Sequence, residues 1–207
     1  MKKGNVIVLL ALFSVLSAVF FWGCGGNDPG SPGSSGSSDT GIAVSVLLVT
    51  HSDPARDQGQ NWQVDLAADQ CTATTVEKWG DDIAHVTFHA EALNPNVTST
   101  NELFVTNYTV TFLKTDPSLP TIEQISGSSQ AGITVLPGQD SGPFDFLVVD
   151  FGRKLKIQSD LSSGVYNVST PLLYNMIINI YGQDKFGNNV TFPPIERLIE
   201  IADYNNC

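Results

Sequence analysis

Hydrophobic and polar positions alternate with a period of two along most of the chain after residue 41. In the segment from Ile83 to Leu93, Val86 and Phe88 fall on one face, whereas His85 and His89 fall on the other. Successive side chains of a β-strand point to opposite faces, so this pattern is typical of a strand with one dry and one wet face. The segment therefore predicts one strand of an antiparallel sheet.

Further segments show the same alternation, or are short runs rich in Val, Ile, Phe, Tyr and Thr, which favour strands. Residues that favour turns separate them, and no long amphipathic helix is evident. We therefore expect residues 42–207 to form one all-β domain, an antiparallel β-sandwich. The predicted strands are Ile42–Thr50, Trp62–Leu66, Cys71–Lys78, Ile83–Leu93, Leu103–Lys114, Ile133–Leu136, Phe144–Val149, Arg153–Gln158, Leu172–Tyr181, Asn189–Phe192 and Ile195–Ile201.

The first residues of the chain follow a different pattern. Lys2 and Lys3 precede an apolar run of 17 residues, from Val6 to Trp22. A positive start and an apolar run are the parts of a secretory signal. As a helix this run would span only about 25 Å, against about 30 Å of hydrocarbon in a bilayer. A cleaved export signal is therefore favoured, with an uncleaved membrane anchor as the alternative.

Gly23 and Cys24 directly follow the apolar run. This pair resembles the lipobox of bacterial lipoproteins. The resemblance implies that the cysteine is diacylated on its sulfur and that residues 1–23 are removed as a signal peptide. In that family, Asp just after the cysteine retains the protein at the inner membrane. Gly25 and Gly26 stand there instead, so the resemblance implies a lipid-anchored protein of the cell envelope at the outer membrane.

Residues 25–41 contain 6 Gly, 5 Ser and 2 Pro. Such a composition cannot bury a core and is typical of a flexible linker. With the lipidated Cys24, residues 24–41 would form a tether with a root-mean-square reach of about 23 Å. The folded domain is thus expected to stand off the membrane surface.

The net charge of the chain limits the kinds of partner that it can bind. The full chain has a net charge of −11, and removal of Lys2 and Lys3 leaves 8 basic against 21 acidic residues, a net charge of −13. Nucleic-acid binding needs clustered Lys and Arg, so a nucleic-acid partner is excluded. The expected partners are the membrane, through the lipid, and an envelope or extracellular protein.

The segment from Asp184 to Asn188 reads Asp-Lys-Phe-Gly-Asn and lies between two predicted strands. This is similar to the D-x-x-G-N turn before the last strand of bacterial immunoglobulin-like domains. The resemblance implies an immunoglobulin-like sandwich. Because a minimal domain of that kind has about 100 residues, we expect extra strands or long loops in residues 58–80 and 117–137.

Two cysteines remain once Cys24 is lipidated, Cys71 and Cys207. An exported protein lies in an oxidising compartment, so we expect a disulfide between them. The alternative is a buried Cys71 and a free terminal thiol. No C-x-x-C motif is present, which excludes a thioredoxin-like redox site on spacing.

Candidate ligand residues are few. On a strand His85 and His89 lie about 13 Å apart, too far to share one metal ion without a residue between them, and we expect no metal site there. The pairs Asp53 with Asp57, Asp65 with Asp69 and Asp81 with Asp82 carry oxygens suited to Ca²⁺, but none follows a calcium-loop motif. Asp184, in its Asn-rich turn, is a further weak calcium candidate.

Trp62 and Trp79 flank the Cys71 segment, and aromatic rings in loops can stack on sugars. They are the candidates for glycan binding, with core packing as the alternative. No catalytic or cofactor-binding motif occurs, so we expect no enzyme activity and no cofactor. The sequence thus favours a non-catalytic domain for interaction, adhesion or structural support. Its alternatives are a glycan- or calcium-binding module and an accessory subunit that docks a basic secreted partner.

Overall fold

The structure is a computed structural model, and it describes residues 41–76, 79–93 and 102–204. The predicted signal peptide and Cys24 lie outside the described residues, as does the expected tether except for its last residue. The described elements are β1 (Ile42–His51), η1 (Pro54–Arg56), β2 (Asp57–Gln58), β3 (Asn61–Asp65), β4 (Asp82–Ala92), β5 (Leu103–Lys114), β6 (Ile125–Val135), β7 (Gln139–Val149), α3 (Phe151–Ser162), β8 (Leu172–Asp184), β9 (Asn189–Thr191) and β10 (Ile195–Ala202).

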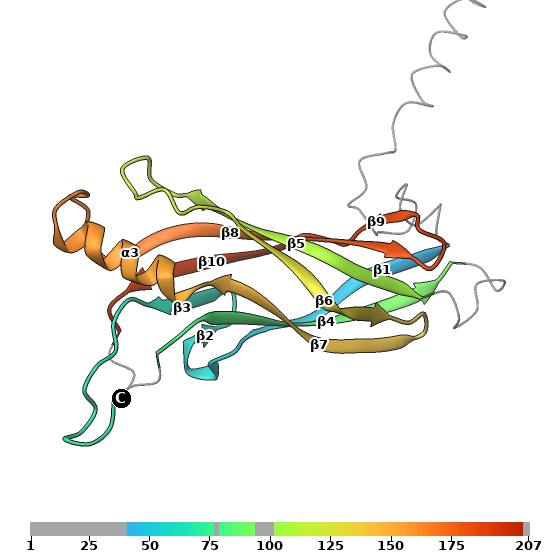
Figure 1. The fold of residues 1–207 in the computed structure, drawn as a ribbon, viewed down its shortest axis with the longest axis horizontal. Coiled ribbons are helices and arrows are strands. Elements are labelled where there is room, and N and C mark those ends of the chain that lie inside the picture. The colour runs from blue at the N-terminus through green and yellow to red at the C-terminus, as the bar shows by residue number, and fades with distance from the viewer. Residues whose placement is uncertain (1–40, 77–78, 94–101, 205–207) are drawn as a thin grey trace, which may run out of the picture.

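The strands form two sheets that run along the length of the molecule (Figure 1). The smaller sheet has the order β1-β4-β7. The larger has seven strands in the order β2-β3-β10-β8-β5-β6, with β9 paired to β8. The expectation of a mainly β protein is therefore confirmed for the described residues.

Aromatic side chains join the inner faces of the two sheets. The ring of Tyr108 on β5 meets that of Phe146 on β7 edge to face, with centroids 5.0 Å apart. The hydroxyl of Tyr108 also accepts a hydrogen bond of 3.0 Å from the backbone N–H of Leu147. Buried alternate residues of both sheets, including Val86, Phe88 and Val110, complete one core. The sheets thus face each other, as the expected sandwich requires.

The larger sheet is mixed, which corrects the expectation of a wholly antiparallel structure. β10 pairs with β8 in the antiparallel sense but with β3 in the parallel sense, from Leu198 opposite Asn61 to Ala202 opposite Asp65. The sequence pattern could not show this, because alternation specifies the faces of a strand and not the direction of its neighbour.

The predicted strand Arg153–Gln158 was wrong, because these residues lie within helix α3. Asp150 caps the helix, since its carboxylate accepts a 2.9 Å hydrogen bond from the backbone N–H of Arg153. The buried residues of the helix are Lys154 and Ile157. A lysine thus occupies one position of the buried stripe, which hid the helical period of three to four residues.

The predicted strand Cys71–Lys78 was also wrong over its described part. Cys71 donates its backbone N–H to the carbonyl of Thr75 at 3.0 Å, and Thr75 donates to the hydroxyl of Thr72 at 3.0 Å. These bonds close a local turn, and one isolated bridge joins Gln70 to Val76. Threonine favours a strand where a neighbouring strand can pair with it, and otherwise its hydroxyl can bond to the nearby backbone, as it does here.

The two ends of the molecule carry different features. At one end Ile42 opens β1 opposite Ala92 of β4. At the other end His51 closes β1 opposite Ala84, and Val149 of β7 leads into α3. We call these the Ile42 end and the α3 end (Figure 1). With a rise of about 3.3 Å per residue, the ten residues of β1 separate them by about 30 Å.

Candidate functional site

A cavity of about 290 Å³ opens at the α3 end. It lies between the segment that follows β1, which includes η1, and the segment that enters β4. Its wall is made by His51, Ser52, Asp53, Arg56, Trp79, Gly80, Asp81, Asp82 and Ile83. This is the part of the described chain where polar, charged and aromatic side chains converge on one hollow.

Buried charges form the floor of the cavity. The guanidinium of Arg56 lies 3.3 Å from an oxygen of Asp65 and 3.7 Å from an oxygen of Asp82. The ammonium of Lys154, from α3, lies 2.8 Å from the other oxygen of Asp82. All four side chains are almost completely buried. Buried ions need partners, so two cations and two carboxylates hold one another in place.

His51 completes this group, which we call the buried ionic cluster: His51, Arg56, Asp65, Asp82 and Lys154. The backbone N–H of Asp53 lies 2.9 Å from Nδ1 of His51, and the Asp53 carbonyl oxygen lies 3.1 Å from the same nitrogen. Nε2 lies 3.2 Å from Asp82. Both ring nitrogens therefore face groups of the protein itself.

Ser52 lies next to His51 in the cavity wall, yet these residues do not assemble a nucleophilic relay. The Ser52 hydroxyl accepts a hydrogen bond of 3.3 Å from the backbone N–H of Ile83. Among the described residues no hydrogen bond joins Ser52 to His51. A serine nucleophile needs a histidine nitrogen within hydrogen-bond reach, and here that nitrogen faces elsewhere.

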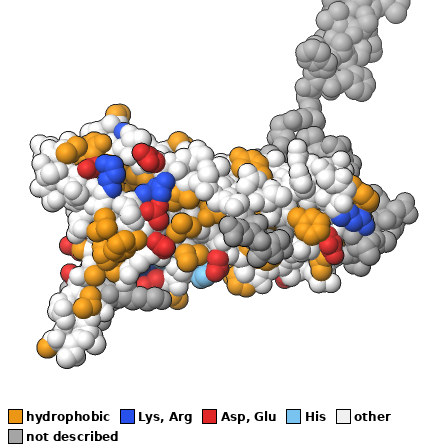
Figure 2. All heavy atoms as spheres, viewed as in Figure 1, with side chains coloured by type: hydrophobic (Ala, Val, Ile, Leu, Met, Phe, Trp, Pro, Cys, Tyr) orange, Lys and Arg blue, Asp and Glu red, His pale blue; other side chains and the backbone are white. Residues whose placement is uncertain are grey.

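The rim of the cavity is aromatic and acidic. Trp79 donates its Nε1–H to the carbonyl of Asp65 at 3.1 Å, which fixes the indole. Its ring meets that of Phe151 with centroids 4.5 Å apart, and Asp81 accepts a 2.7 Å hydrogen bond from the backbone N–H of Phe151. Phe151 and Leu155 remain 40% and 41% exposed. Figure 2 shows hydrophobic side chains gathered at this end beside charged ones.

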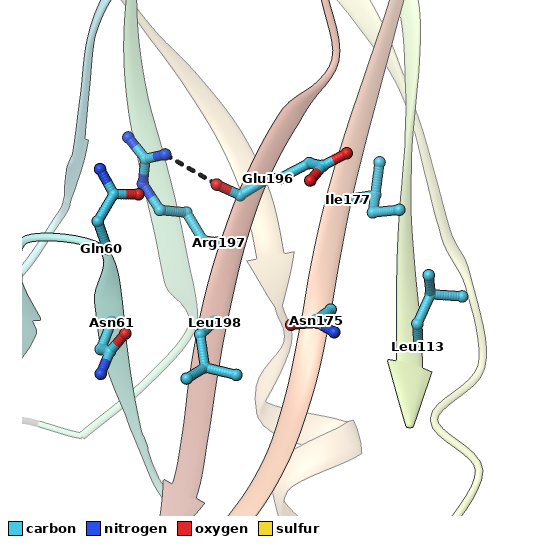
Figure 3. A pocket seen from close by; sticks show the side chains of 8 residues that line it. All are labelled: Gln60, Asn61, Leu113, Asn175, Ile177, Glu196, Arg197 and Leu198. Atoms are coloured by element: carbon cyan, nitrogen blue, oxygen red, sulfur yellow. Dashed lines mark hydrogen bonds between the residues drawn. The ribbon is translucent and has the colours of Figure 1, made fainter. Parts of the chain in front are cut away.

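A second hollow, of about 420 Å³, lies on the outer face of the larger sheet. Asn61, Leu198, Asn175 and Leu113 form a row across β3, β10, β8 and β5, as their register requires (Figure 3). Arg197 lies above this row and donates to the carbonyl of Glu196 at 2.8 Å. Amide and leucine side chains alternate along the row, and none of the described residues that line the hollow is aromatic, so they offer no stacking surface for a sugar.

Of the predicted glycan-binding residues, only Trp79 reaches the cavity. Trp62 is 1% exposed, in the core, with its ring 5.4 Å from that of His51 and 5.9 Å from the guanidinium of Arg197. It therefore presents no ring face to a ligand. The alternative of core packing describes Trp62 better.

The two predicted surface histidines lie on the outer face of the smaller sheet, each bound to its own aspartate of β7. Nδ1 of His85 lies 2.6 Å from Asp145, and Nδ1 of His89 lies 2.6 Å from Asp140. The bond with Asp140 is the main cause that raises the pKa of His89 above its ordinary value. No group of three metal-ligating side chains occurs in residues 41–76, 79–93 and 102–204.

The carboxylate of Asp184, the weak calcium candidate, accepts hydrogen bonds from its own turn. One carboxylate oxygen accepts 2.8 Å hydrogen bonds from the backbone N–H groups of Phe186 and Asn188, and the other accepts from the Asn188 amide. Burial by itself raises the pKa of this carboxyl, but these hydrogen bonds together lower it below its ordinary value. The carboxylate serves the turn, so it is not free to face a cation.

The other acidic pairs are split between structural roles. Asp65 and Asp82 belong to the buried ionic cluster, and Asp57 accepts from the backbone N–H groups of His51 and Gly59. Asp53 holds η1, because its carboxylate accepts from the backbone N–H of Ala55. Their spacing along the sequence thus reflects loop and core structure more than a shared ligand.

The structure describes only one of the two cysteines that are predicted to form a disulfide. Cys71 lies in the segment between β3 and β4, where its sulfur is 4.0 Å from the carbonyl of Asp69. Cys207 lies outside the described residues, so the disulfide stays a prediction.

Comparison with protein-family models, curated proteins and solved structures found no match to this chain. In the part of the chain that the structure describes, no helix has the length and apolar character needed to cross a membrane.

Sequence reasoning missed most of the buried ionic cluster. The sequence suggests Asp65 and Asp82 as cation ligands, and no pattern along it groups His51, Arg56 and Lys154 with them. One signal was available, since Lys154 stands three residues before Ile157 and seven before Leu161, at helical spacing with them.

Proposed function

We propose that this protein is a lipid-anchored lipoprotein of the cell envelope, at the outer membrane, that displays a non-catalytic β-sandwich to a protein partner. The observation that carries the proposal is the order of three features: an apolar run, Cys24 directly after Gly23, and a Gly/Ser/Pro-rich segment that ends where β1 begins at Ile42. Several acyl chains on one cysteine give stable attachment, whereas a single chain is marginal.

The position of the cavity supports a display function. A tether that enters at Ile42 leaves the α3 end as the part of the domain farthest from the point of attachment, about 30 Å away along β1. The cavity and its aromatic rim lie at that α3 end. A flexible tether raises the local concentration of this end near partners at the same surface.

The strand order supports an immunoglobulin-like sandwich. In such domains strands A, B and E share one sheet, and strands C, F and G share the other. Assigning β1, β4 and β7 to A, B and E, and β5, β8 and β10 to C, F and G, reproduces this division. β6 then extends the second sheet beside β5, as an added strand does in variable-type domains.

A non-catalytic role agrees with the state of the cavity residues. The ring nitrogens of His51 both face internal groups, and the Ser52 hydroxyl serves as an acceptor for Ile83. The charged side chains of the cavity floor form ion pairs with one another. The exposed features that remain are an aromatic rim and carboxylates, which suit binding.

The proposed disulfide agrees with the paths of the two chain segments. Asp65 and Ala202 are register partners on parallel strands, and Leu66 donates its backbone N–H to Ala202 at 2.8 Å. The segments that follow these two residues therefore leave the larger sheet side by side. Cys71 follows Asp65 by six residues and Cys207 follows Ala202 by five, so short segments of similar length lead to the two thiols.

Membrane fractionation of cells that produce matched variants tests the anchor. With residues 1–23 replaced by a signal peptide that is cleaved without a lipobox, a chain carrying Cys24→Ala should move into the soluble fraction, whereas Cys71→Ala in the natural chain should leave the protein in the membrane pellet. Density separation of the wild-type membranes should place it with the outer membrane. A Cys24→Ala protein that has lost its leader and still sediments with membranes as wild type does would overturn the lipoprotein proposal.

A further inference from the structure

We propose that the cavity at the α3 end docks a basic polypeptide partner by taking one of its lysine or arginine side chains between Trp79 and the carboxylates of Asp53 and Asp81. This inference rests on the proposed display function, because it names the chemistry of the displayed site. The proposed occupant is a basic segment of a protein.

The size of the cavity suits a single side chain. Pockets for drug-sized ligands have volumes of about 300–1,000 Å³, and this cavity, at about 290 Å³, lies just below that range. One long side chain can enter such a hollow while the rest of the partner stays on the surface. The exposed ring of Phe151 meets that of Trp79 in the cavity wall, and Leu155, also exposed, lies one helical turn further along the same side of α3. Together they offer an apolar surface for that remainder.

The charges of the cavity favour a cation. Its single guanidinium, that of Arg56, is flanked by the carboxylates of Asp53, Asp65 and Asp82, at 3.5, 3.3 and 3.7 Å. Lys154 is committed to Asp82 behind the floor. Asp81 adds a further carboxylate at the rim, so acidic groups exceed basic ones around the hollow.

Two of these acids face outward. The Asp53 side chain is 31% exposed, and Asp81 is exposed. Asp81 uses one carboxylate oxygen to accept from the backbone N–H of Phe151, which aims the group without neutralising it. A carboxylate held in this way is a preorganised acceptor for an ammonium or guanidinium group.

Trp79 is the third side chain of the proposed site, beside Asp53 and Asp81. Its Nε1–H is tied to the carbonyl of Asp65, so the indole is held in place in the cavity wall. A cation within about 6 Å of an indole centroid is attracted by the ring, most strongly where water is displaced. Over a longer range, the mature net charge of −13 steers a basic partner toward the domain and repels an acidic one.

The test uses the mature lipoprotein in detergent and a fluorescent oligolysine peptide as the probe, with an oligoglutamate peptide as the charge control. Nuclear magnetic resonance shifts of the indole N–H groups report binding at the site directly, because the mature chain keeps only two tryptophans, Trp62 and Trp79. Oligolysine should shift the Trp79 resonance and leave that of Trp62 in place. Oligoglutamate should shift neither.

Matched variants separate the site from general attraction to an acidic surface. Asp81→Asn keeps the oxygen that accepts from Phe151, and Trp79→Phe keeps a ring. Each should weaken oligolysine binding by about fivefold or more. Asp140→Asn removes the same charge from the Ile42 end and should change the affinity by less than about twofold. Unchanged melting temperatures verify that each variant is folded.

Three results would overturn the inference: equal weakening by Asp81→Asn and Asp140→Asn, a Trp79 resonance that oligolysine does not move, or a shift of that resonance by a neutral oligosaccharide alone. The signal that is read is the Trp79 resonance, which does not depend on the acyl chains, and a chain that retains its leader adds only a third indole signal, from Trp22. A failure here therefore leaves the lipoprotein proposal standing, and a failed fractionation leaves this assay interpretable.

Discussion

The ammonium nitrogen of Lys154 lies 2.8 Å from a carboxylate oxygen of Asp82, and both side chains are buried. This ion pair joins helix α3 to strand β4 beneath the cavity. It explains how a lysine can occupy the buried stripe of a helix. It also means that the wall of the cavity and the position of α3 depend on the same contact.

Removal of the Lys154 charge should therefore destabilise the protein strongly. Lys154→Met leaves Asp82 buried with fewer cations, and breaking a buried pair costs about 3 kcal/mol or more. Urea unfolding measures the change. Lys156→Met is the matched control, because Lys156 is paired with Asp160 at the surface of the same helix, and its loss should cost about 1 kcal/mol or less. Equal effects of the two variants would contradict a buried role for Lys154.

The pKa of His89 should lie above the ordinary histidine value. Because the folded-state pKa of His89 is raised by Asp140, its contribution to stability is complete below the ordinary pKa and is lost as pH rises through the raised value. Nuclear magnetic resonance titration should show the raised pKa in wild type and its return toward normal in Asp140→Asn. Asp145→Asn, beside His85, should leave the His89 titration in place; a shift there of similar size counts against the assignment.

Asp184 should stabilise the turn between β8 and β9 in a pH-dependent way. Its folded-state pKa is lowered, so its contribution is present above the ordinary carboxyl pKa and is lost as pH falls through the folded-state value. The difference in unfolding free energy between wild type and Asp184→Asn should thus shrink as pH falls from neutrality to below about 4. Asp203→Asn, at an exposed position, should show no such trend. A constant difference would show that the charge has no role in the turn.

The mature protein should contain no free thiol. With the Cys24 sulfur acylated and Cys71 bonded to Cys207, iodoacetamide should label nothing in the denatured, unreduced protein and two cysteines after reduction. The disulfide would close a loop of 136 residues, which stabilises by at most about 5 kcal/mol in the chain-entropy model. Cys71→Ala should lower the melting temperature accordingly. Labelling of Cys71 before reduction would rule out the bond.

Strand β5 shows what the sequence could predict. Its bounds, Leu103–Lys114, are as predicted, although a bulge between Val105 and Asn107 shifts the buried positions from Leu103 and Val105 to Tyr108, Val110 and Phe112. Helix α3 shows the opposite case, since the partner that makes a buried Lys154 acceptable lies 72 residues away, at Asp82. A pattern in one segment cannot reveal a partner in another.

The candidate site was predictable only in part for the same reason. Trp79 and the acidic pairs stood out by residue type. The cavity, however, is assembled from three segments, which contribute His51 with Arg56, Trp79 with Asp82, and Lys154 behind them. Their convergence follows from the pairing of β1 with β4 and of β4 with β7, which local periodicity does not specify.

Intact and peptide-level mass spectrometry of protein extracted from membranes tests the central proposal most directly. We expect a chain that begins at Cys24, with acyl groups on the sulfur and on the new amino terminus, and no peptide from residues 1–23. Recovery of the full-length chain with its leader attached and an unmodified Cys24 would contradict it.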